Sequence, residues 1–279
     1  MFRHILYYVT SVLLLLHPYV CYSTDYKPDK ETDKRIEALL GKMTLEEKIG
    51  QMNQLHCENF PYLKTETRKG RVGSVMSITD PNIFNEVQRI AVEDSRLGIP
   101  LINARDVIHG FKTIFPIPLG QAASFNPEIA ETGARIAATE ASAAGIRWTF
   151  APMIDITHDP RWGRIAEGFG EDPLLVSQMG VAAIKGFQGS SLNHPTSIAA
   201  CAKHFAGYGA SEGGRDYNST YITERQFRNL YLRPFEAAVN AGAATLMTAF
   251  NDNDGIPSSA NPFLLKDCLL YTSPSPRDA

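Results

Sequence analysis

The stretch SIAACAKH, residues 197–204, carries the clearest structural signal in the chain: a run of small and apolar residues that ends in a Lys-His pair. The stretch ATLMTAFND, residues 244–252, repeats this pattern and ends in Asn-Asp. An apolar run without polar alternation is typical of a strand in a parallel sheet that is covered on both faces. We therefore expect two such strands, each followed by polar groups.

Apolar runs of this kind alternate with helical patterns along most of the chain. Strands are predicted at residues 72–78, 99–103, 147–154, 198–203 and 244–250. Helices are predicted at residues 82–97, 127–144, 173–187 and 223–241, with a capping box at Thr44 opening another and Asn261 beginning one more. Such alternation predicts parallel βα units, in an open doubly wound sheet or a (β/α)8 barrel. No glycine-rich phosphate fingerprint follows the first strand, which weakens a dinucleotide-binding fold.

Composition sets limits on the class of protein. The chain has 279 residues, 44% of them hydrophobic and 20% charged, with a formal net charge of −3. This is ordinary globular composition and argues against disorder. The near-neutral charge argues against a nucleic-acid partner, which usually requires a basic excess. The length permits one barrel or two medium domains.

The N-terminus is predicted to be a signal peptide. Arg3 and His4 precede an apolar run, residues 5–16, that is too short to span a bilayer. Cleavage after Ser23 is expected, and a lipid anchor at Cys21 is the alternative. We therefore expect residues 1–23 to be removed and the protein to be periplasmic or extracellular, with no membrane attachment.

The C-terminus, residues 268–279, reads CLLYTSPSPRDA and interrupts a helix start with two Ser-Pro pairs. A flexible Pro/Ser tail is one interpretation. Residues 268–278 are also similar to the translation of a transposase adapter used in sequencing libraries. That similarity predicts that residues 24–267 are the natural domain, that residues 268–279 are an artefact, and that the natural protein continues past Asp267.

Polar residues follow four of the predicted strands, at the end where function collects in a βα barrel. They are Arg105, Asp106 and His109, then Asp155, Arg161 and Arg164, then Lys203 and His204, and finally Asn251 and Asp252. Carboxylates accept hydrogen bonds from sugar hydroxyls, and Arg and Lys donate to them. The sequence therefore suits a pyranose ligand. Aromatic residues available for its apolar faces are Trp148, Phe150, Trp162 and Tyr208.

Each of these residues also has a structural interpretation. Taken alone, Asp106 is more often a helix cap or an ion-pair partner. Arg161 is expected to form an ion pair, with Asp155 and Asp159 as candidate partners for the arginines of this segment. His109 is expected to bond loop backbone.

The sequence predicts no metal and no cofactor. No group of His, Cys and carboxylates has metal-ligand spacing, and no Gly-x-Ser-x-Gly nucleophile elbow is present. Cys57 and Cys201 show no disulfide-framework density. Export permits a bridge between them, and the sequence leaves open whether they pair.

Several segments together resemble glycoside hydrolase family 3, and its exported bacterial β-glucosidases in particular. They are RDVIHG, FAPMIDITHDPRWGR, EGFGEDP, KHFAGYGASEGGRDYN and LMTAFNDNDGIPSSANPFLLKD. The resemblance as a whole covers roughly residues 31–267, in order and without large gaps. The resemblance implies a (β/α)8 TIM-like barrel, here incomplete at its C-terminal end. It also implies a following α/β sandwich domain that this chain lacks.

The resemblance implies a set of sugar-binding residues. In the motifs above they are Asp106, Arg164, Lys203 and His204, with Met247 lining the pocket. The family's nucleophile is an aspartate in a Ser-Asp-Trp or Ser-Asp-His motif beyond residue 267, and its acid/base is expected in the second domain. No catalytic residue is therefore assigned here, and the chain itself is expected to be inactive. Tyr208 stands where the family's N-acetylglucosaminidases carry a catalytic histidine, which sets that subgroup aside.

The function implied for the full-length parent is retaining hydrolysis of terminal non-reducing β-D-glucosyl residues, with a β-glucoside or oligosaccharide as substrate. A β-xylosidase of the same family is the near alternative. A truncated barrel that binds sugar without cleaving it is the second. A βα barrel of another class, such as a phosphate-handling enzyme, is the third, and no phosphate loop supports it.

Overall fold

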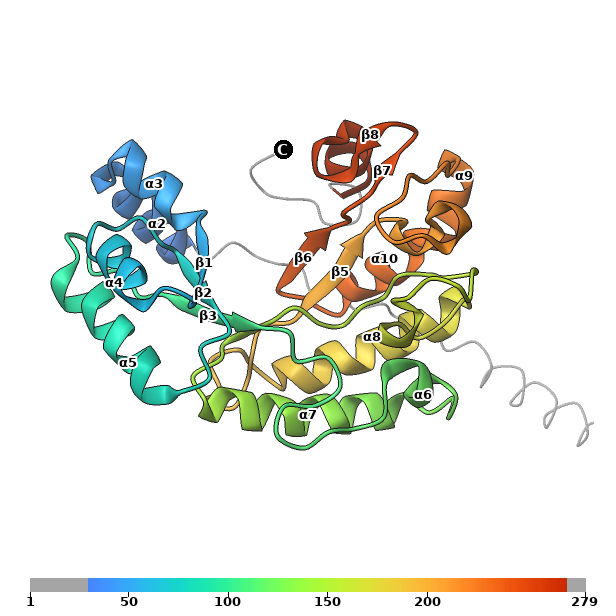
Figure 1. Ribbon diagram of the computed structural model, residues 1–279, viewed down its shortest axis with the longest axis horizontal. Helices are drawn as coiled ribbons and strands as arrows, with labels where there is room; N and C mark the ends of the chain where they lie inside the picture. Colours follow the sequence, from blue (N-terminus) through green and yellow to red (C-terminus); the bar gives the residue numbers. More distant parts are fainter. Residues whose placement is uncertain (1–29, 270–279) are drawn as a thin grey trace, which may run out of the picture.

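The computed structural model describes residues 30–269, so the predicted signal peptide and most of the predicted artefact tail lie outside the described part. Parallel strands form a curved wall, and helices cover its outer side (Figure 1). Within residues 30–269, no helix is long and apolar enough to cross a membrane.

The wall consists of six parallel strands. They are β1 (Gln54–His56), β2 (Ser74–Met76), β3 (Ile102–Arg105), β4 (Trp148–Thr149), β5 (Cys201–Phe205) and β6 (Thr245–Thr248). Strands β1 to β4 form one parallel sheet in chain order, and β5 pairs with β6 in a second. Parallel bridges from Trp148 to Ala199 and from Met153 to Lys203 join the two sheets. Spatial order therefore follows chain order, as in a (β/α)8 barrel, and the described strands form an incomplete TIM-like barrel.

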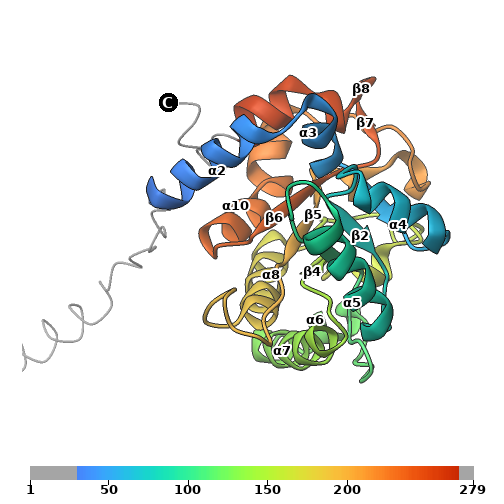
Figure 2. The ribbon, with the colours of Figure 1, turned by 90° about the vertical axis from the view of Figure 1, so that its left-hand side faces the viewer.

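Two helices precede β1, and the others lie in the connections between strands. The helices are α2 (Lys30–Lys42), α3 (Leu45–Gln51), α4 (Phe60–Arg68), α5 (Pro81–Arg89), α6 (Pro118–Ala122), α7 (Pro127–Ala143), α8 (Pro173–Gln188), α9 (Glu224–Gln226) and α10 (Arg233–Asn240). Short π-helical turns follow α5, at Ile90–Asp94, and α9, at Phe227–Tyr231. A third lies at the end of the described chain, at Phe263–Cys268. Figure 2 shows α7 and α8 stacked below the strands, with α10 beside them. An antiparallel hairpin, β7 (Asp252–Asn253) and β8 (Ile256–Pro257), follows β6.

The alternation of strands and helices and the predicted capping box are confirmed. Thr44 Oγ1 accepts a hydrogen bond from the backbone N–H of Glu47 at 3.2 Å, and Glu47 Oε2 accepts from the backbone N–H of Thr44 at 2.9 Å. The helix that this box begins is α3, which ends at Gln51. Strand β1 and the β7–β8 hairpin were not predicted, because each is only two or three residues long.

Three predicted strands have the wrong boundaries. The segments expected at 99–103 and 198–203 form strands about three residues later, at β3 and β5. The segment expected at 147–154 is a regular strand only at Trp148–Thr149, because Pro152 has no N–H to donate to a strand ladder. Residues 151–154 still bond β5: the carbonyl of Pro152 accepts from the N–H of Lys203 at 3.1 Å, and the N–H of Ile154 donates to the carbonyl of Lys203 at 2.8 Å.

The main core lies between the strands and helices α7, α8 and α10, and a smaller cluster lies under β2 and α5. A third apolar group, around Ala104, Phe150 and Cys201, covers the inner side of the wall. Cys57 and Cys201 both carry free thiols, so they do not form a disulfide in this structure.

Helices α7 and α8 approach each other closely where glycine removes a side chain. A Cβ on Gly186 would lie 2.3 Å from the carbonyl oxygen of Glu131 and 2.7 Å from the Cβ of Ala134. Backbone cannot move aside as a flexible side chain can, so this position requires glycine.

We predict that Gly186→Ala destabilises the protein by about 1–3 kcal/mol, the usual cost of overpacking a close contact. The matched control is Gly41→Ala at the end of α2, where a Cβ would meet nothing within 4 Å. The urea midpoint of each variant, measured by pulse proteolysis of the soluble protein, checks the difference. Equal midpoints for the two variants would contradict the assigned α7–α8 contact.

Candidate active site

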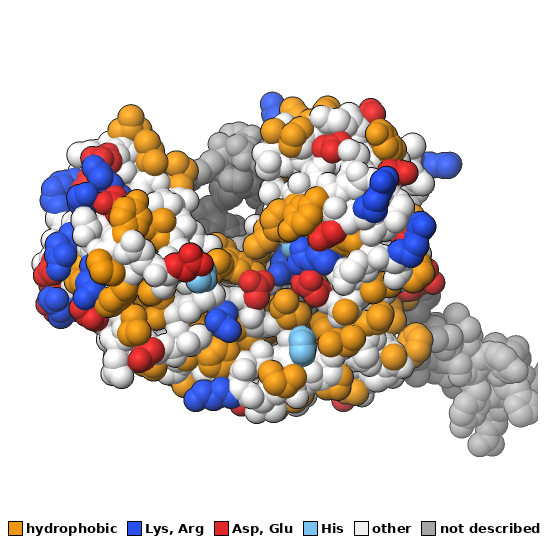
Figure 3. Space-filling model, viewed as in Figure 1, with side chains coloured by type: hydrophobic (Ala, Val, Ile, Leu, Met, Phe, Trp, Pro, Cys, Tyr) orange, Lys and Arg blue, Asp and Glu red, His pale blue; other side chains and the backbone are white. Residues whose placement is uncertain are grey.

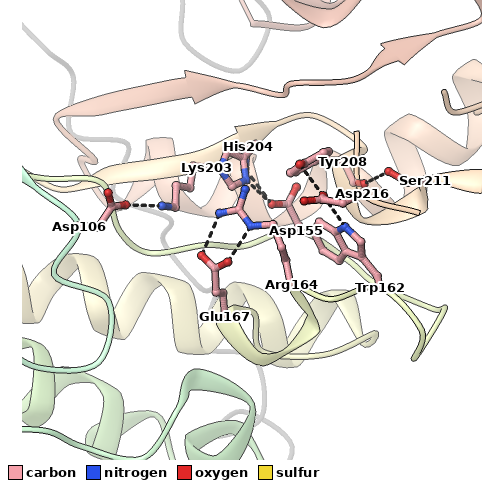
Figure 4. Close-up of polar contacts among 10 residues, drawn as sticks. All are labelled: Asp106, Asp155, Trp162, Arg164, Glu167, Lys203, His204, Tyr208, Ser211 and Asp216. Atoms are coloured by element: carbon pink, nitrogen blue, oxygen red, sulfur yellow. Dashed lines mark hydrogen bonds and ion pairs between the residues drawn. The ribbon is translucent and has the colours of Figure 1, made fainter. Parts of the chain in front are cut away.

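Charged side chains gather at one edge of the wall, on β5 and on the segments that follow β3 and β4. Figure 3 shows basic and acidic side chains together in the hollow between the two halves of the molecule. The close-up in Figure 4 shows that they come from loops and strands far apart in the chain and point toward one another. This gathering follows from parallel strand order, which brings successive strand ends to one edge.

Asp106 and Lys203 form the first ion pair of the site. Asp106 is the residue after β3, and Lys203 lies within β5. Lys203 Nζ donates to Asp106 Oδ1 at 2.8 Å, and the side chains are 3% and 51% exposed, respectively. The buried ammonium is therefore held by a carboxylate that still has accessible oxygen surface, as a hydroxyl ligand would require.

His204 and Asp155 form a second, fully buried pair. Asp155 follows the segment that bonds β5, and its Oδ2 lies 2.8 Å from His204 Nδ1. The same oxygen accepts a hydrogen bond from the backbone N–H of His204 at 3.0 Å. Asp155 was expected to pair with an arginine, and this prediction is wrong. Asp155 pairs instead with His204, which β5 places beside it.

Arg164 is paired with Glu167 from the next short turn. The guanidinium donates from Nε at 2.7 Å and from Nη2 at 2.9 Å to the two carboxylate oxygens. Burial opposes the charged form of Arg164, but the hydrogen bonds and charge attraction to Glu167 and Tyr208 together outweigh burial and raise the pKa of Arg164. Burial likewise opposes ionisation of Glu167, and the Arg164 hydrogen bond lowers the pKa of Glu167. Both groups are therefore held charged at the site.

Behind Arg164 lies a network centred on Asp216. Its Oδ1 accepts hydrogen bonds from the Tyr208 hydroxyl at 2.6 Å and from Trp162 Nε1 at 2.9 Å. Burial, together with the hydrogen bond to Asp216, raises the pKa of Tyr208, so the phenol stays protonated and donates. The Arg164 guanidinium lies 5.5 Å from the Tyr208 ring centroid, within the range of a cation–π contact. This network fixes the arginine from one side while Glu167 holds it from the other.

The aromatic residues expected to contact a sugar are mostly unavailable. Phe150, Trp162 and Tyr208 are buried in the structure, because they pack as core behind the charged groups. Phe250 and Tyr217 are instead exposed, at 54% and 62%, with their ring centroids 5.6 Å apart. Phe250 also lies 5.1 Å from the His204 ring, so the exposed aromatic surface adjoins the site.

The structure brings together the residues singled out in the sequence. Asp106, Arg164, Lys203 and His204 all lie in the cluster of Figure 4. Met247 is half-buried on β6, in register with Lys203, and packs against the apolar group on the inner side of the wall. Sugar binding by these five residues stays a prediction.

The sequence did not indicate two carboxylates of the cluster, but it correctly predicted the contacts of two residues that support the surrounding loops. Glu167 and Asp216 were not singled out, although Glu167 stands three residues after Arg164, a spacing that allows contact within one turn. The expected pair of Arg161 and Asp159 is confirmed at 2.7 Å and lies at the surface. His109 bonds loop backbone as expected, through Nδ1 to the carbonyl of Phe115 at 2.9 Å.

Chemically, the cluster combines the donors Lys203, Arg164 and His204 with four carboxylates, those of Asp106, Asp155, Glu167 and Asp216. It can bind a polyhydroxylated ligand, because each hydroxyl can accept from Lys or Arg while donating to a carboxylate or an imidazole nitrogen. Among residues 30–269, no group of three or more His, Cys, Asp and Glu side chains is placed to hold a metal ion.

Known proteins with similar sequences and structures share this domain. The periplasmic β-glucosidase of Salmonella typhimurium is 40% identical over 240 residues, covering 85% of this chain and 31% of that protein. The crystal structure of a β-glucosidase from Listeria innocua in complex with glucose matches with a TM-score of 0.80 at 40% identity, covering 85% of this chain and 35% of that one. A putative β-xylosidase of Formosa agariphila is 35% identical over 274 residues, covering 88% of this chain and 36% of that protein.

The chain thus spans about a third of the length of these relatives. Residues 44–272 match the model of the glycosyl hydrolase family 3 N-terminal domain. Together with the strand order and the charged cluster at the strand ends, this match shows that the chain belongs to glycosyl hydrolase family 3.

Proposed function

We propose that this chain supplies most of the sugar-binding subsite of a retaining β-glucosidase that removes terminal non-reducing β-D-glucosyl residues. The observation that carries the proposal is the cluster of Asp106–Lys203, Arg164–Glu167 and His204–Asp155 pairs in one hollow. A β-glucoside or oligosaccharide is the proposed substrate. The β-glucosidases of Salmonella typhimurium and Listeria innocua, both 40% identical to this chain, support that choice.

The cluster fits a pyranose because its donors and acceptors alternate. Asp106 is half exposed beside the buried Lys203, so one hydroxyl can donate to the carboxylate while a neighbour accepts from the ammonium. Arg164 is 19% exposed, so part of this charged side chain is accessible to a ligand. The exposed ring of Phe250 offers an apolar surface next to these groups.

We place the two reacting carboxyl groups beyond residue 267. Retaining hydrolysis requires a nucleophile and an acid/base about 5–5.5 Å apart on either side of the bond that breaks. Each described carboxylate of the site already holds a partner: Asp106 holds Lys203, Glu167 holds Arg164, and Asp155 and Asp216 accept hydrogen bonds from protein groups. None of these supplies a free acid and nucleophile together, which supports a chain that binds sugar without turning it over.

Two other functions share this cluster. A β-xylosidase is supported by the Formosa agariphila relative at 35% identity. Xylose lacks the C6 hydroxymethyl group of glucose, so contacts near C6 would separate the two specificities. The third possibility is a sugar-binding protein without catalytic activity. This domain would be the same in such a protein, and the difference would be that its gene encodes no downstream nucleophile, which both hydrolases require.

For localisation, we propose export to the periplasm or beyond. The apolar run at residues 5–16 and the periplasmic relative from Salmonella typhimurium support it. We also keep the proposal that residues 24–267 are the natural domain and residues 268–279 an adapter-derived tail.

Replacing Lys203 is predicted to weaken sugar binding strongly. In Lys203→Met the apolar chain is kept, but a charge-assisted hydrogen bond worth about 1.5–3 kcal/mol is lost, so affinity for D-glucose should fall about 10- to 100-fold. Saturation-transfer NMR titration of the chain measures the affinity. Lys64→Met is the matched control, because Lys64 pairs with Glu86 between α4 and α5, away from the hollow. Equal affinities for both variants would remove Lys203 from the site.

The chain as it stands is predicted not to hydrolyse β-glucosides, because we propose that the reacting carboxyl groups lie beyond residue 267. Release of nitrophenol from p-nitrophenyl β-D-glucoside by the purified chain, compared with a mock preparation, measures this directly. A long read of the source locus across codon 267 is the companion measurement, and we expect it to continue into a strand ending in Ser-Asp. Turnover above the mock level would place the reacting groups within this chain instead.

A further inference from the structure

His204 and Asp155 form the most deeply buried ionisable pair of the site. The Asp155 side chain is 0% exposed and that of His204 is 1% exposed. Burying such groups is costly unless their hydrogen bonds are made within the protein. The pair therefore has a defined geometry, and the geometry determines what the histidine can offer to a ligand.

A single oxygen of Asp155 makes both contacts with His204. Oδ2 accepts from the backbone N–H at 3.0 Å and lies 2.8 Å from ring Nδ1. Because a carboxylate oxygen that serves a backbone N–H is acting as an acceptor, the ring nitrogen that faces it must be the donor. The proton of a neutral ring is then on Nδ1, and Nε2 carries the lone pair.

Aromatic rings pack against the imidazole, and the hydrogen bond to Asp155 selects its orientation. Tyr208 and Phe250 each lie 5.1 Å from the His204 ring centroid, at interplanar angles of 76° and 49°. Turning the ring over would place a carbon against Asp155 Oδ2 and leave the carboxylate without its ring partner. Figure 4 shows the ring among Lys203, Arg164 and Tyr208, so the remaining nitrogen belongs to the same cluster.

We propose that Asp155 is a positioning residue that holds His204 as its Nδ1-protonated tautomer, so that Nε2 accepts a hydrogen bond from a sugar hydroxyl. The inference rests on the proposed sugar-binding function of the cluster. Lys203 and Arg164 can only donate, so a hydroxyl that accepts from either of them needs an acceptor for its own proton. His204 Nε2 and Asp106 supply two such acceptors, and Asp155 determines that His204 is one of them.

The test uses two substitutions of Asp155. Asp155→Leu removes the acceptor, and we expect glucose affinity to fall about 2- to 10-fold, the value of one hydrogen bond. Asp155→Asn keeps an oxygen that can accept from both His204 groups, so we expect it to retain most of the affinity. Asn103→Leu is the matched control. Asn103 and Asp155 are both buried, and each has a second side-chain oxygen without a described partner. Asn103 donates to the carbonyl of Ile78 and does not contact the site.

A double-mutant cycle separates positioning from general stability. If Asp155 acts through the imidazole, Asp155→Leu should lower glucose affinity in the wild-type background and have no further effect in the His204→Phe background. Equal losses in both backgrounds would show that Asp155 acts on the fold rather than through His204, and would overturn the proposal.

The tautomer itself is read from the 15N NMR spectrum of the chain with labelled histidine, at a pH where the ring is neutral. The His204 signals are assigned by their loss in His204→Phe. We expect a protonated Nδ1 and an unprotonated Nε2 in the wild type, and a tautomer mixture in Asp155→Leu. A wild-type ring protonated at Nε2 overturns the proposal. If wild-type chain fails to bind glucose, the proposed function fails, while the spectrum still decides the role of Asp155.

Discussion

The hydrogen bonds between residues 149–154 and residues 199–203 hold this structure together, because they join the sheet of β1 to β4 to the pair β5 and β6. Without them the two sheets would have no common edge. The same bonds place Asp155 beside His204, and they bring Lys203 within reach of Asp106 across 97 positions of sequence. The wall and the charged cluster are therefore products of one set of backbone contacts, although Pro152 interrupts the strand that provides them.

Much of the fold could be predicted from local signals. Side chains that cap the first turn, such as Thr44, indicate where helices begin. Long helical patterns of apolar residues identify α7 and α8. Strand boundaries were less predictable, because a parallel strand begins where its partner begins rather than where its own apolar run does. Thus the ladder of β5 starts at Cys201, opposite Thr245, although the apolar run starts earlier. Strand β1 has no pattern long enough to detect.

The sequence predicted which residues form the charged cluster better than it predicted which of them pair with one another. Asp106, Lys203, Arg164 and His204 were found because strand ends and family motifs both pointed to them. Which carboxylate serves which cation depends on how loops return across the hollow, and only the structure shows that Glu167 serves Arg164 and that Asp155 serves His204. The aromatic residues expected to contact a sugar were predicted wrongly for a related reason. Trp162 and Tyr208 donate hydrogen bonds to Asp216 and are buried, whereas Phe250, just after β6, is exposed to solvent.

The match between strand order and chain order has a consequence for biosynthesis. Each new strand of the wall pairs with the strand made just before it, so a chain emerging from the ribosome can extend the sheet one βα unit at a time, without waiting for distant segments. The Lys203–Asp106 contact instead closes a loop across 97 positions of sequence. The charged cluster is thus assembled only after β5 has been synthesised, so it forms late in this sequence and is not the nucleus of folding.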